Sequence, residues 1–229
     1  MSTYVWCEDT GSGFEFWKRV FGVLYKKYTV ESKRNNTELC KAVSKITEEG
    51  NRYYILLDSA IDNPEVLRET QRLYSAMKNK ESVSLIKIHS FEFVLLSFKM
   101  LVDWVFAEQD ELKEKRTGLL DLKDILVDVI NNGGDVAKLK AMKAALSISE
   151  TLNTEQLSAK LLFEITRNTG FETTKGRLGA CFTVDCCEWA DRMPDDICGL
   201  DGAGTTADQK IFEIYENSVL KESFAKAGL

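Results

Sequence analysis

Short apolar segments alternate with helix-forming segments through the first half of the chain, and this alternation restricts the fold more than any other feature. The strand-like segments lie at residues 3–7, 29–32, 53–58 and 83–88. Each is followed by apolar residues at helical spacing, as Trp17, Val20 and Phe21 are after the first. Strands that alternate with helices form a parallel, helix-covered sheet, because a parallel crossover needs a dozen or more residues. We therefore expect residues 1–105 to form an α/β domain with a mostly parallel sheet, in which the first and third strands are neighbours.

From residue 106 the pattern changes, and we expect residues 106–229 to be mostly helical. An apolar helix over residues 91–106 leads into this part, and one last helix over residues 206–227 closes it. Residues 170–206 are rich in Gly, Thr, Asp and Cys, which predicts an irregular segment between helices.

The composition indicates a folded protein that is not a general nucleic-acid coat. Hydrophobic residues make up 44% of the 229 residues, which is enough for a substantial core. The net charge is −6 and the pI is about 5.1, which argues against a broadly basic binding surface. An enzyme that reaches phosphates through a metal ion remains compatible with this charge, because the ion supplies the positive charge.

Nothing near the N-terminus has the pattern of a signal peptide, and Glu92, Lys99 and Asp103 interrupt the longest apolar run. We therefore expect a cytoplasmic protein that makes no membrane contact and keeps its cysteines reduced. Four of the cysteines, Cys181, Cys186, Cys187 and Cys198, fall in the irregular segment. Their spacing lacks the paired C-x₂-C knuckles of a zinc ribbon, so buried thiols are favoured over a zinc site.

Acidic residues follow the first and third predicted strands. Glu8 and Asp9 come directly after the first strand, and Asp58 and Asp62 end the third. Because the carboxyl ends of parallel strands meet at one edge of a sheet, Glu8 and Asp58 are expected to converge there. Carboxylate oxygens suit Mg²⁺ or Mn²⁺, and such an ion can orient a phosphodiester and activate water. Acids at strand ends also serve as helix caps and turn formers, so a purely structural role stays open.

Three segments carry a resemblance to a known family. VWCEDTGSGFEFWKRVF, residues 5–21, is an apolar strand that ends in Glu8 and turns into an aromatic-bearing helix. YYILLDSAID, residues 53–62, is an apolar strand that ends in Asp58, and IKIHSFEFVLL, residues 86–96, places a Glu at the start of an apolar helix. In a βαβαβαβ order these segments resemble a Toprim domain, the module of topoisomerases, bacterial primases and nucleases of the overcoming-lysogenisation-defect type. The third segment is similar to small stand-alone Toprim proteins of phage-defence loci.

The resemblance implies a Mg²⁺- or Mn²⁺-dependent nuclease that cleaves DNA or RNA, in phage defence or on a mobile element. It implies that Asp58 holds the metal ion and that Glu8 holds it or acts as general acid and base. The sequence departs from the family at two positions, because Asp9 follows Glu8 where the family has Gly, and Ala60 stands where the family has a second metal-binding Asp. Asp62 is the expected replacement ligand, and Asp9 is the other candidate.

Two other functions stay open beside the nuclease. The first is a catalytically degenerate Toprim-like protein that binds or regulates, with a protein partner engaged through the C-terminal half. The second is a nucleotide-binding flavodoxin-like module, which is disfavoured because Gly11 and Gly13 lack the Lys-Ser/Thr of a P-loop. For these two glycines a tight turn is favoured over a phosphate cradle.

Three further residues are weaker candidates. Lys33 and Arg34 form the basic cluster near the end of the second strand, where they can touch a phosphate backbone or simply be solvated. His89 is the single histidine and follows the fourth strand, so it is a structural residue or a general base at the same edge.

Overall fold

The computed structural model describes residues 2–47, 50–60, 62–106, 110–169, 171, 180–186, 198–200 and 204–229. Within them lie four strands: β1 (Thr3–Cys7), β2 (Tyr28–Ser32), β3 (Arg52–Asp58) and β4 (Val83–Ile88). The helices of the first half are α1 (Gly11–Leu24), α2 (Asn36–Ser44), α3 (Pro64–Met77), α4 (Phe91–Ser97) and α5 (Leu101–Phe106). Those of the second half are α6 (Asp110–Lys115), α7 (Thr117–Asn132), α8 (Val136–Ala145), α9 (Thr154–Thr166), α10 (Ala180–Thr183), α11 (Ala207–Glu216) and α12 (Leu220–Ala227).

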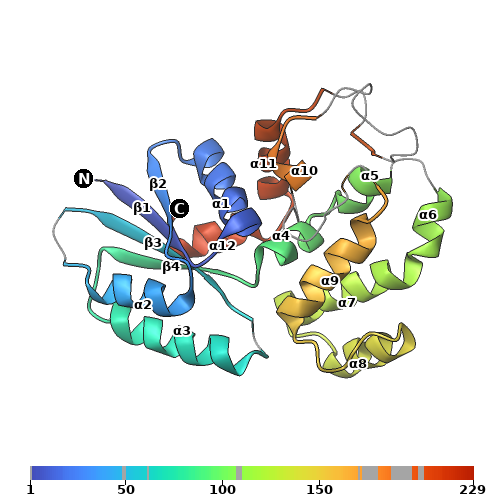
Figure 1. The fold of residues 1–229 in the computed structure, drawn as a ribbon, viewed down its shortest axis with the longest axis horizontal. Coiled ribbons are helices and arrows are strands. Elements are labelled where there is room, and N and C mark those ends of the chain that lie inside the picture. Colours follow the sequence, from blue (N-terminus) through green and yellow to red (C-terminus); the bar gives the residue numbers. More distant parts are fainter. Residues whose placement is uncertain are drawn as a thin grey trace.

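The four strands form one parallel sheet in the order β2-β1-β3-β4. In its register Val5 lies beside Tyr54, and Ile55 lies beside Leu85. The prediction of a parallel sheet with adjacent first and third strands is thus confirmed. All four strands point their carboxyl ends toward the helical second half of the chain (Figure 1).

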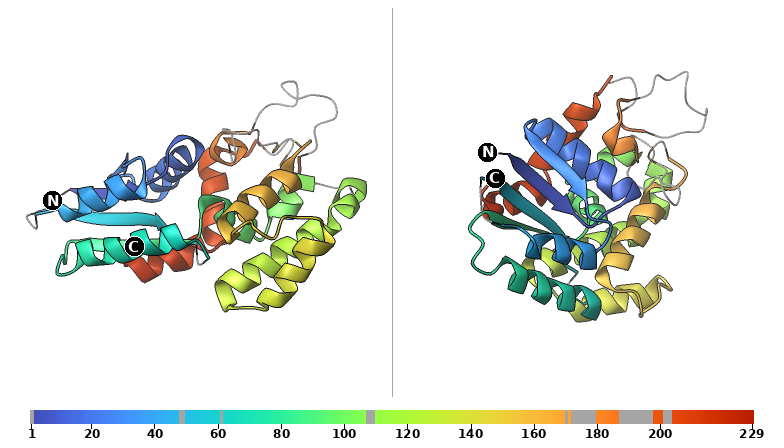
Figure 2. Two further views of the ribbon diagram at one scale, coloured as in Figure 1. Left: turned by 60° about the horizontal axis from the view of Figure 1, so that its bottom comes forward. Right: turned by 60° about the vertical axis from the view of Figure 1, so that its left-hand side comes forward.

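Helices cover both faces of the sheet. On one face α2 and α3 pack side by side over an apolar cluster that includes Leu39, Ile55 and Leu73. On the other face α1 and the returning C-terminal helix α12 lie over β2 and β4 (Figures 1 and 2). The alternation along β3 explains the two faces, because Tyr54 and Leu56 enter one cluster and Ile55 and Leu57 enter the other.

The larger apolar core runs through both halves of the chain. It joins Val5 and Ile86 of the sheet to Leu126 of α7, Leu161 of α9 and Phe224 of α12. The proposed division at residue 105 therefore separates two types of architecture that share one core. No helix in the described part of the chain is both long enough and apolar enough to cross a bilayer.

Two predicted helices are each broken in the structure. The helix expected over residues 91–106 ends at Ser97 and restarts at Leu101, and the one expected over 206–227 ends at Glu216 and restarts at Leu220. The two breaks bind each other: the Lys99 amide donates to the Asn217 carbonyl (3.0 Å), and the Val219 amide donates to Ser97 Oγ (3.3 Å). Apolar periodicity alone did not reveal these breaks, because their partners lie more than 100 residues apart in sequence.

Helix α9 is held at both ends by charged side chains from distant segments. At its start, the Asp62 carboxylate accepts hydrogen bonds from the Thr154 amide (2.9 and 3.0 Å) and hydroxyl (2.7 Å). At its end, the buried guanidinium of Arg116 donates to the carbonyls of Ile165 and Arg167. A negative group at the amino end and a positive group at the carboxyl end both oppose the helix dipole favourably.

Replacing Arg116 is expected to destabilise the fold through the end of α9. Arg116→Met keeps an apolar stem but leaves the carbonyls of Ile165 and Arg167 without their donor, which should cost about 2–3 kcal/mol. The exposed neighbour Lys115 provides the matched control, and Lys115→Met should change stability by less than about 0.5 kcal/mol. Urea unfolding of both variants measures this, and equal small losses would contradict the role given to Arg116.

Candidate functional site

A cavity of about 720 Å³ opens at the carboxyl edge of the sheet, where the turns after β1 and β3 face the first turns of α2, α3 and α9. Among the described residues that line it, six are acidic and two are arginines. The lining consists of Glu8, Asp9, Thr10, Asn35, Asn36, Thr37, Asp58, Asn63, Glu65, Val66, Arg68, Glu69, Arg72 and Glu155. The expected convergence of Glu8 and Asp58 at one edge is therefore present.

Asp58 is the most unusual acid of the cavity. Its Oδ1 atom is buried and has no hydrogen-bond partner among the described residues. Burial first, and then the charges of Asp9 and Glu8, raise its pKa well above the usual range. A buried carboxylate oxygen without a donor is costly, so it marks a place where a cation or a proton would be favoured. Asn36, which also lines the cavity, has a buried Oδ1 in the same condition.

Glu8 and Asp9 lie beside Asp58 because β1 pairs with β3. Burial and the charge of Asp9 raise the pKa of Glu8 to about 7, although the Asp58 backbone amide partly offsets this rise. Burial raises the pKa of Asp9 to about 6 against the opposing effect of the indole of Trp17, whose Nε1 donates to Asp9 Oδ2 (2.8 Å). Both groups therefore change protonation state near neutral pH.

The glycine turn after β1 is shaped around Asp9. Gly11 has φ +59°, a left-handed conformation that strains other residues. A Cβ at Gly13 would lie 2.4 Å from Asp9 Oδ1, so only glycine leaves room for the carboxylate. The carboxyl group of Asp9 fills the space inside this turn. The turn is therefore a tight turn, as expected, and leaves no room there for a bound phosphate.

Two acids reach the same region from helices. Glu92, in the first turn of α4, has its pKa raised to about 7 by burial and then by the charges of Asp9 and Glu155. Glu155, in the first turn of α9, lines the cavity and raises the pKa of Glu8, Asp9 and Asp58. No pattern in the sequence marked Glu155 as functional, because an acid in the first turn of a helix is ordinary.

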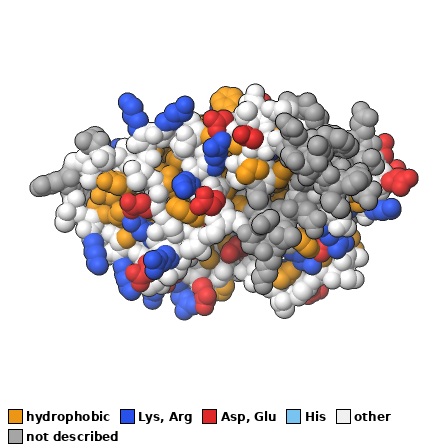
Figure 3. Space-filling model, turned by 45° about the horizontal axis from the view of Figure 1, so that its top comes forward, with side chains coloured by type: hydrophobic (Ala, Val, Ile, Leu, Met, Phe, Trp, Pro, Cys, Tyr) orange, Lys and Arg blue, Asp and Glu red, His pale blue; other side chains and the backbone are white. Residues whose placement is uncertain are grey.

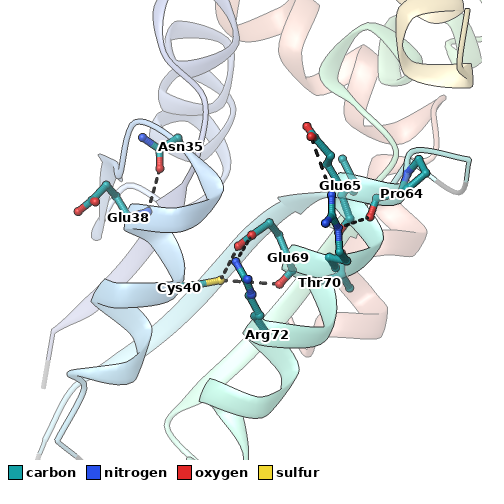
Figure 4. Close-up of polar contacts among 10 residues, drawn as sticks. Asn35, Glu38, Cys40, Pro64, Glu65, Glu69, Thr70 and Arg72 are labelled. Atoms are coloured by element: carbon teal, nitrogen blue, oxygen red, sulfur yellow. Dashed lines mark hydrogen bonds and ion pairs between the residues drawn. The ribbon is translucent and has the colours of Figure 1, made fainter.

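One wall of the cavity is formed by α3, whose Glu69 and Arg72 lie on the side that faces α2 (Figure 4). Arg72 binds Glu69 (2.6 Å), and Glu69 lies against the thiol of Cys40 on α2. Arg68, one turn before Arg72, is also exposed and lines the cavity. These two guanidinium groups place positive charge at the rim of an otherwise acidic cavity.

The other predicted site residues, Asp62 and His89, have different surroundings. Asp62 does not line the cavity, and its carboxylate binds the start of α9, so its assignment as a metal ligand stays a prediction. His89 is buried edge-on against Phe93, with ring centroids 5.2 Å apart. Neither of its ring nitrogens makes a hydrogen bond of normal geometry to a described residue. Burial lowers its pKa, and the backbones of Thr154 and Ser59 and the charge of Asp62 partly offset this.

Three of the four cysteines of the irregular segment are described. Cys198 belongs to the larger apolar core, and Cys181 and Cys186 pack against it. Cys187 lies outside the described residues, so the predicted thiol cluster is described only in part.

Comparisons with family models, with curated proteins and with solved structures gave no match for this chain. Among the described residues, no group of three or more His, Cys, Asp or Glu side chains stands ready to hold a metal ion. The case for a function therefore depends on the chemistry of the cavity itself.

The raised pKa values predict that the acidic cluster loses stability as the pH rises. In the folded state Glu8, Asp9 and Glu92 bind protons more tightly than in the unfolded chain, with pKa values of about 7, 6 and 7. Their stabilising contribution is full below about pH 4 and is lost as the pH passes 6–7. Asp58→Asn removes one charge from this cluster, so in EDTA it should be more stable than the wild type at pH 8 and lose this advantage toward pH 5.

Thermal melting of both proteins from pH 5 to 8 measures the difference. His89 changes stability in the opposite direction, because its lowered pKa favours the folded state as the pH rises, but it is present in both proteins and cancels. Asp121→Asn on the exposed side of α7 is the control and should follow the wild type. A parallel pH dependence of Asp58→Asn and the wild type would contradict the repulsion described here.

Replacement by alanine is expected to have opposite effects on stability at two glycines of α1. Gly22→Ala meets no atom within 4 Å and should raise stability by about 0.5–1 kcal/mol, since alanine favours a helix. Gly13→Ala must displace the Asp9 carboxylate and break its bond to Trp17, so stability should fall by roughly 1–2 kcal/mol. Urea unfolding compares the two, and a gain at Gly13 would show that Asp9 is not held in this position.

Proposed function

We propose that this protein cleaves phosphodiester bonds of DNA or RNA with Mg²⁺ or Mn²⁺ held at the carboxyl edge of its sheet. Glu8 and Asp58 would hold the ion, with Asp9 as a further oxygen ligand from the same edge. The Toprim resemblance of residues 3–105 supports this proposal, and so does the parallel sheet that brings the two acids together.

The observation that carries the proposal is the unpaired, buried Oδ1 of Asp58 among neighbouring carboxylates. Buried like charges are unfavourable unless protons or cations compensate them. The donor atoms of these acids are all oxygens, which are the ligands that hard divalent ions such as Mg²⁺ prefer. When bound, such an ion polarises a phosphoryl oxygen and lowers the pKa of water.

The protein's own groups suit the proton transfers of hydrolysis. A water oxygen attacks phosphorus, the bond from phosphorus to the leaving oxygen breaks, and a carboxylate takes the proton that the water loses. If Glu8 does not hold the ion, it can accept this proton and return it to the leaving oxygen near neutral pH, because burial and the charge of Asp9 raise its pKa in the metal-free protein to about 7. Arg68 and Arg72 at the rim can pair with non-bridging phosphate oxygens.

A second function is favoured by one observation at position 60. Ala60 is fully buried and presents no oxygen to the cavity at the place where the resembling family has its second acid. A protein that binds a cation or a nucleic acid here without cleaving it is the alternative, in keeping with a degenerate Toprim-like domain.

The test combines cleavage and melting. Wild type with Mn²⁺ should cleave a labelled DNA or RNA strand and should melt at a higher temperature than in EDTA. Glu8→Gln and Asp58→Asn should lose both effects, and Asp121→Asn should keep both. A rise in melting temperature without cleavage would support the binding-only alternative. Neither effect in the wild type would refute both the nuclease and a cation-binding role.

Asp62→Ala tests the remaining predicted ligand. Loss of the hydrogen bonds that Asp62 accepts from Thr154 should lower the melting temperature in EDTA, since replacing a capping acid by alanine costs on the order of 1 kcal/mol. If Asp62 also binds the ion through water, the increase caused by Mn²⁺ will shrink as well. An unchanged increase would leave Asp62 with its structural role alone.

A further inference from the structure

A second hollow, of about 430 Å³, lies on the outer side of α2. It is formed by the turn between β2 and α2 and by the exposed face of that helix. Among the described residues that line it, four are cations, Lys33, Arg34, Lys41 and Lys45, and one is a carboxylate, Glu38. This is a local excess of positive charge in a chain whose net charge is −6. We call these four cations the basic groove.

The cations of the basic groove converge on the same space. Lys41 binds Glu38 (2.7 Å) and is the largest cause of its lowered pKa, with smaller contributions from Lys45 and Arg34. Lys33 binds Glu31 and lies over the ring of Trp6, 4.0 Å from its centroid. Arg34 and Lys45 are exposed, and among the described residues neither forms an ion pair within 4 Å.

The basic groove and the acidic cavity share one turn of the chain. Asn35, Asn36 and Thr37 line the acidic cavity, and the residues immediately before and after them line the basic groove. Figure 4 shows the same division, with Glu38 on the side of α2 away from α3 and Cys40 facing α3. The Ser32 hydroxyl joins the two sites, because it donates to the Asp9 carbonyl and accepts from the Arg34 amide (3.1 Å).

Arg34 occupies a backbone conformation that does not suit it. Its φ of 73° lies in the left-handed region, where asparagine and glycine are much more common than arginine. Such a residue costs stability and is typical of functional positions. The chain therefore keeps a long cation at the junction of the two sites although a smaller residue would fit the turn better.

We propose that the basic groove binds the sugar–phosphate backbone of a nucleic-acid strand whose neighbouring phosphate lies in the acidic cavity. This deepens the proposed function, because it identifies the substrate as a strand of several nucleotides and separates it from a mononucleotide or a small phosphoester. The acidic cavity by itself repels a polyanion, and cations directly beside it offset this repulsion. Among the described residues, the face shown in Figure 3 carries basic and acidic side chains intermixed.

Binding without metal tests the groove separately from cleavage. The probes are fluorescein-labelled dT20 and U20, and anisotropy is measured in EDTA at 50 and 200 mM NaCl. Arg34→Asn combined with Lys45→Gln should weaken binding on the order of tenfold at the lower salt and should reduce the slope of log K against log salt by about 1.4, for two single-strand contacts. The matched control, Lys138→Gln with Lys140→Gln on the exposed side of α8, should bind like the wild type. Loss with one probe only would identify the strand as DNA or as RNA.

Arg34→Asn alone distinguishes a binding role from a structural one. Asparagine tolerates the left-handed conformation, so this variant should melt at the same or a higher temperature while it binds the strand more weakly. A lower melting temperature together with weaker binding would assign Arg34 to the fold and overturn the proposal.

Three other outcomes would also overturn it. They are equal binding by the double variant and the wild type, equal affinity for dT3 and dT20, and displacement of dT20 by polyglutamate as effectively as by unlabelled dT20. The groove and the proposed function can fail separately. Groove-dependent binding with no Mn²⁺-dependent cleavage removes the nuclease alone, and cleavage that is unchanged in the double variant removes the groove alone.

Discussion

The pairing of β1 with β3 determines where the charges of this protein lie. Both strands run in the same direction, so the acids that follow them, Glu8, Asp9 and Asp58, come together at one edge of the sheet. Their mutual repulsion and burial oppose folding at neutral pH, as the raised pKa values indicate. The larger apolar core offsets this cost, since it joins one face of the sheet to most of the described helices in one cluster.

The helical half of the chain completes the acidic edge and does not merely cover it. Glu155 reaches the cavity because α9 begins beside the turn that follows β3, where Asp62 binds its first residue. Arg116 fixes the other end of the same helix from a distant segment. Charged groups outside the cavity thus position a charged group inside it, and a change at either end of α9 would be felt at the site.

Much of the α/β part could be predicted from the sequence, because its signals are local. Apolar runs of strand length, separated by helical periodicity, were enough for the parallel sheet and for the meeting of Glu8 with Asp58. The breaks at residues 98–100 and 217–219 were not predictable, because they depend on hydrogen bonds between segments that are far apart in sequence. Glu155 was missed for the same reason, since its place in the cavity follows from how α9 docks. The proposed role of Arg34 depends on its left-handed backbone conformation, which could not be predicted from the residue type alone.

One hydrogen bond at the acidic cavity links a tryptophan to an acid whose charge depends on pH. The buried indole of Trp17 donates to the carboxylate of Asp9, so the ring lies in the field of a group that gains or loses a proton near pH 6. The absorption and emission of an indole shift with a nearby charge, and this charge acts at hydrogen-bond distance in a poorly screened interior. Of the four tryptophans in the chain, Trp17 is therefore a built-in reporter of the cavity, and the arrival of protons or cations there can be followed through its ultraviolet absorption and fluorescence without any label.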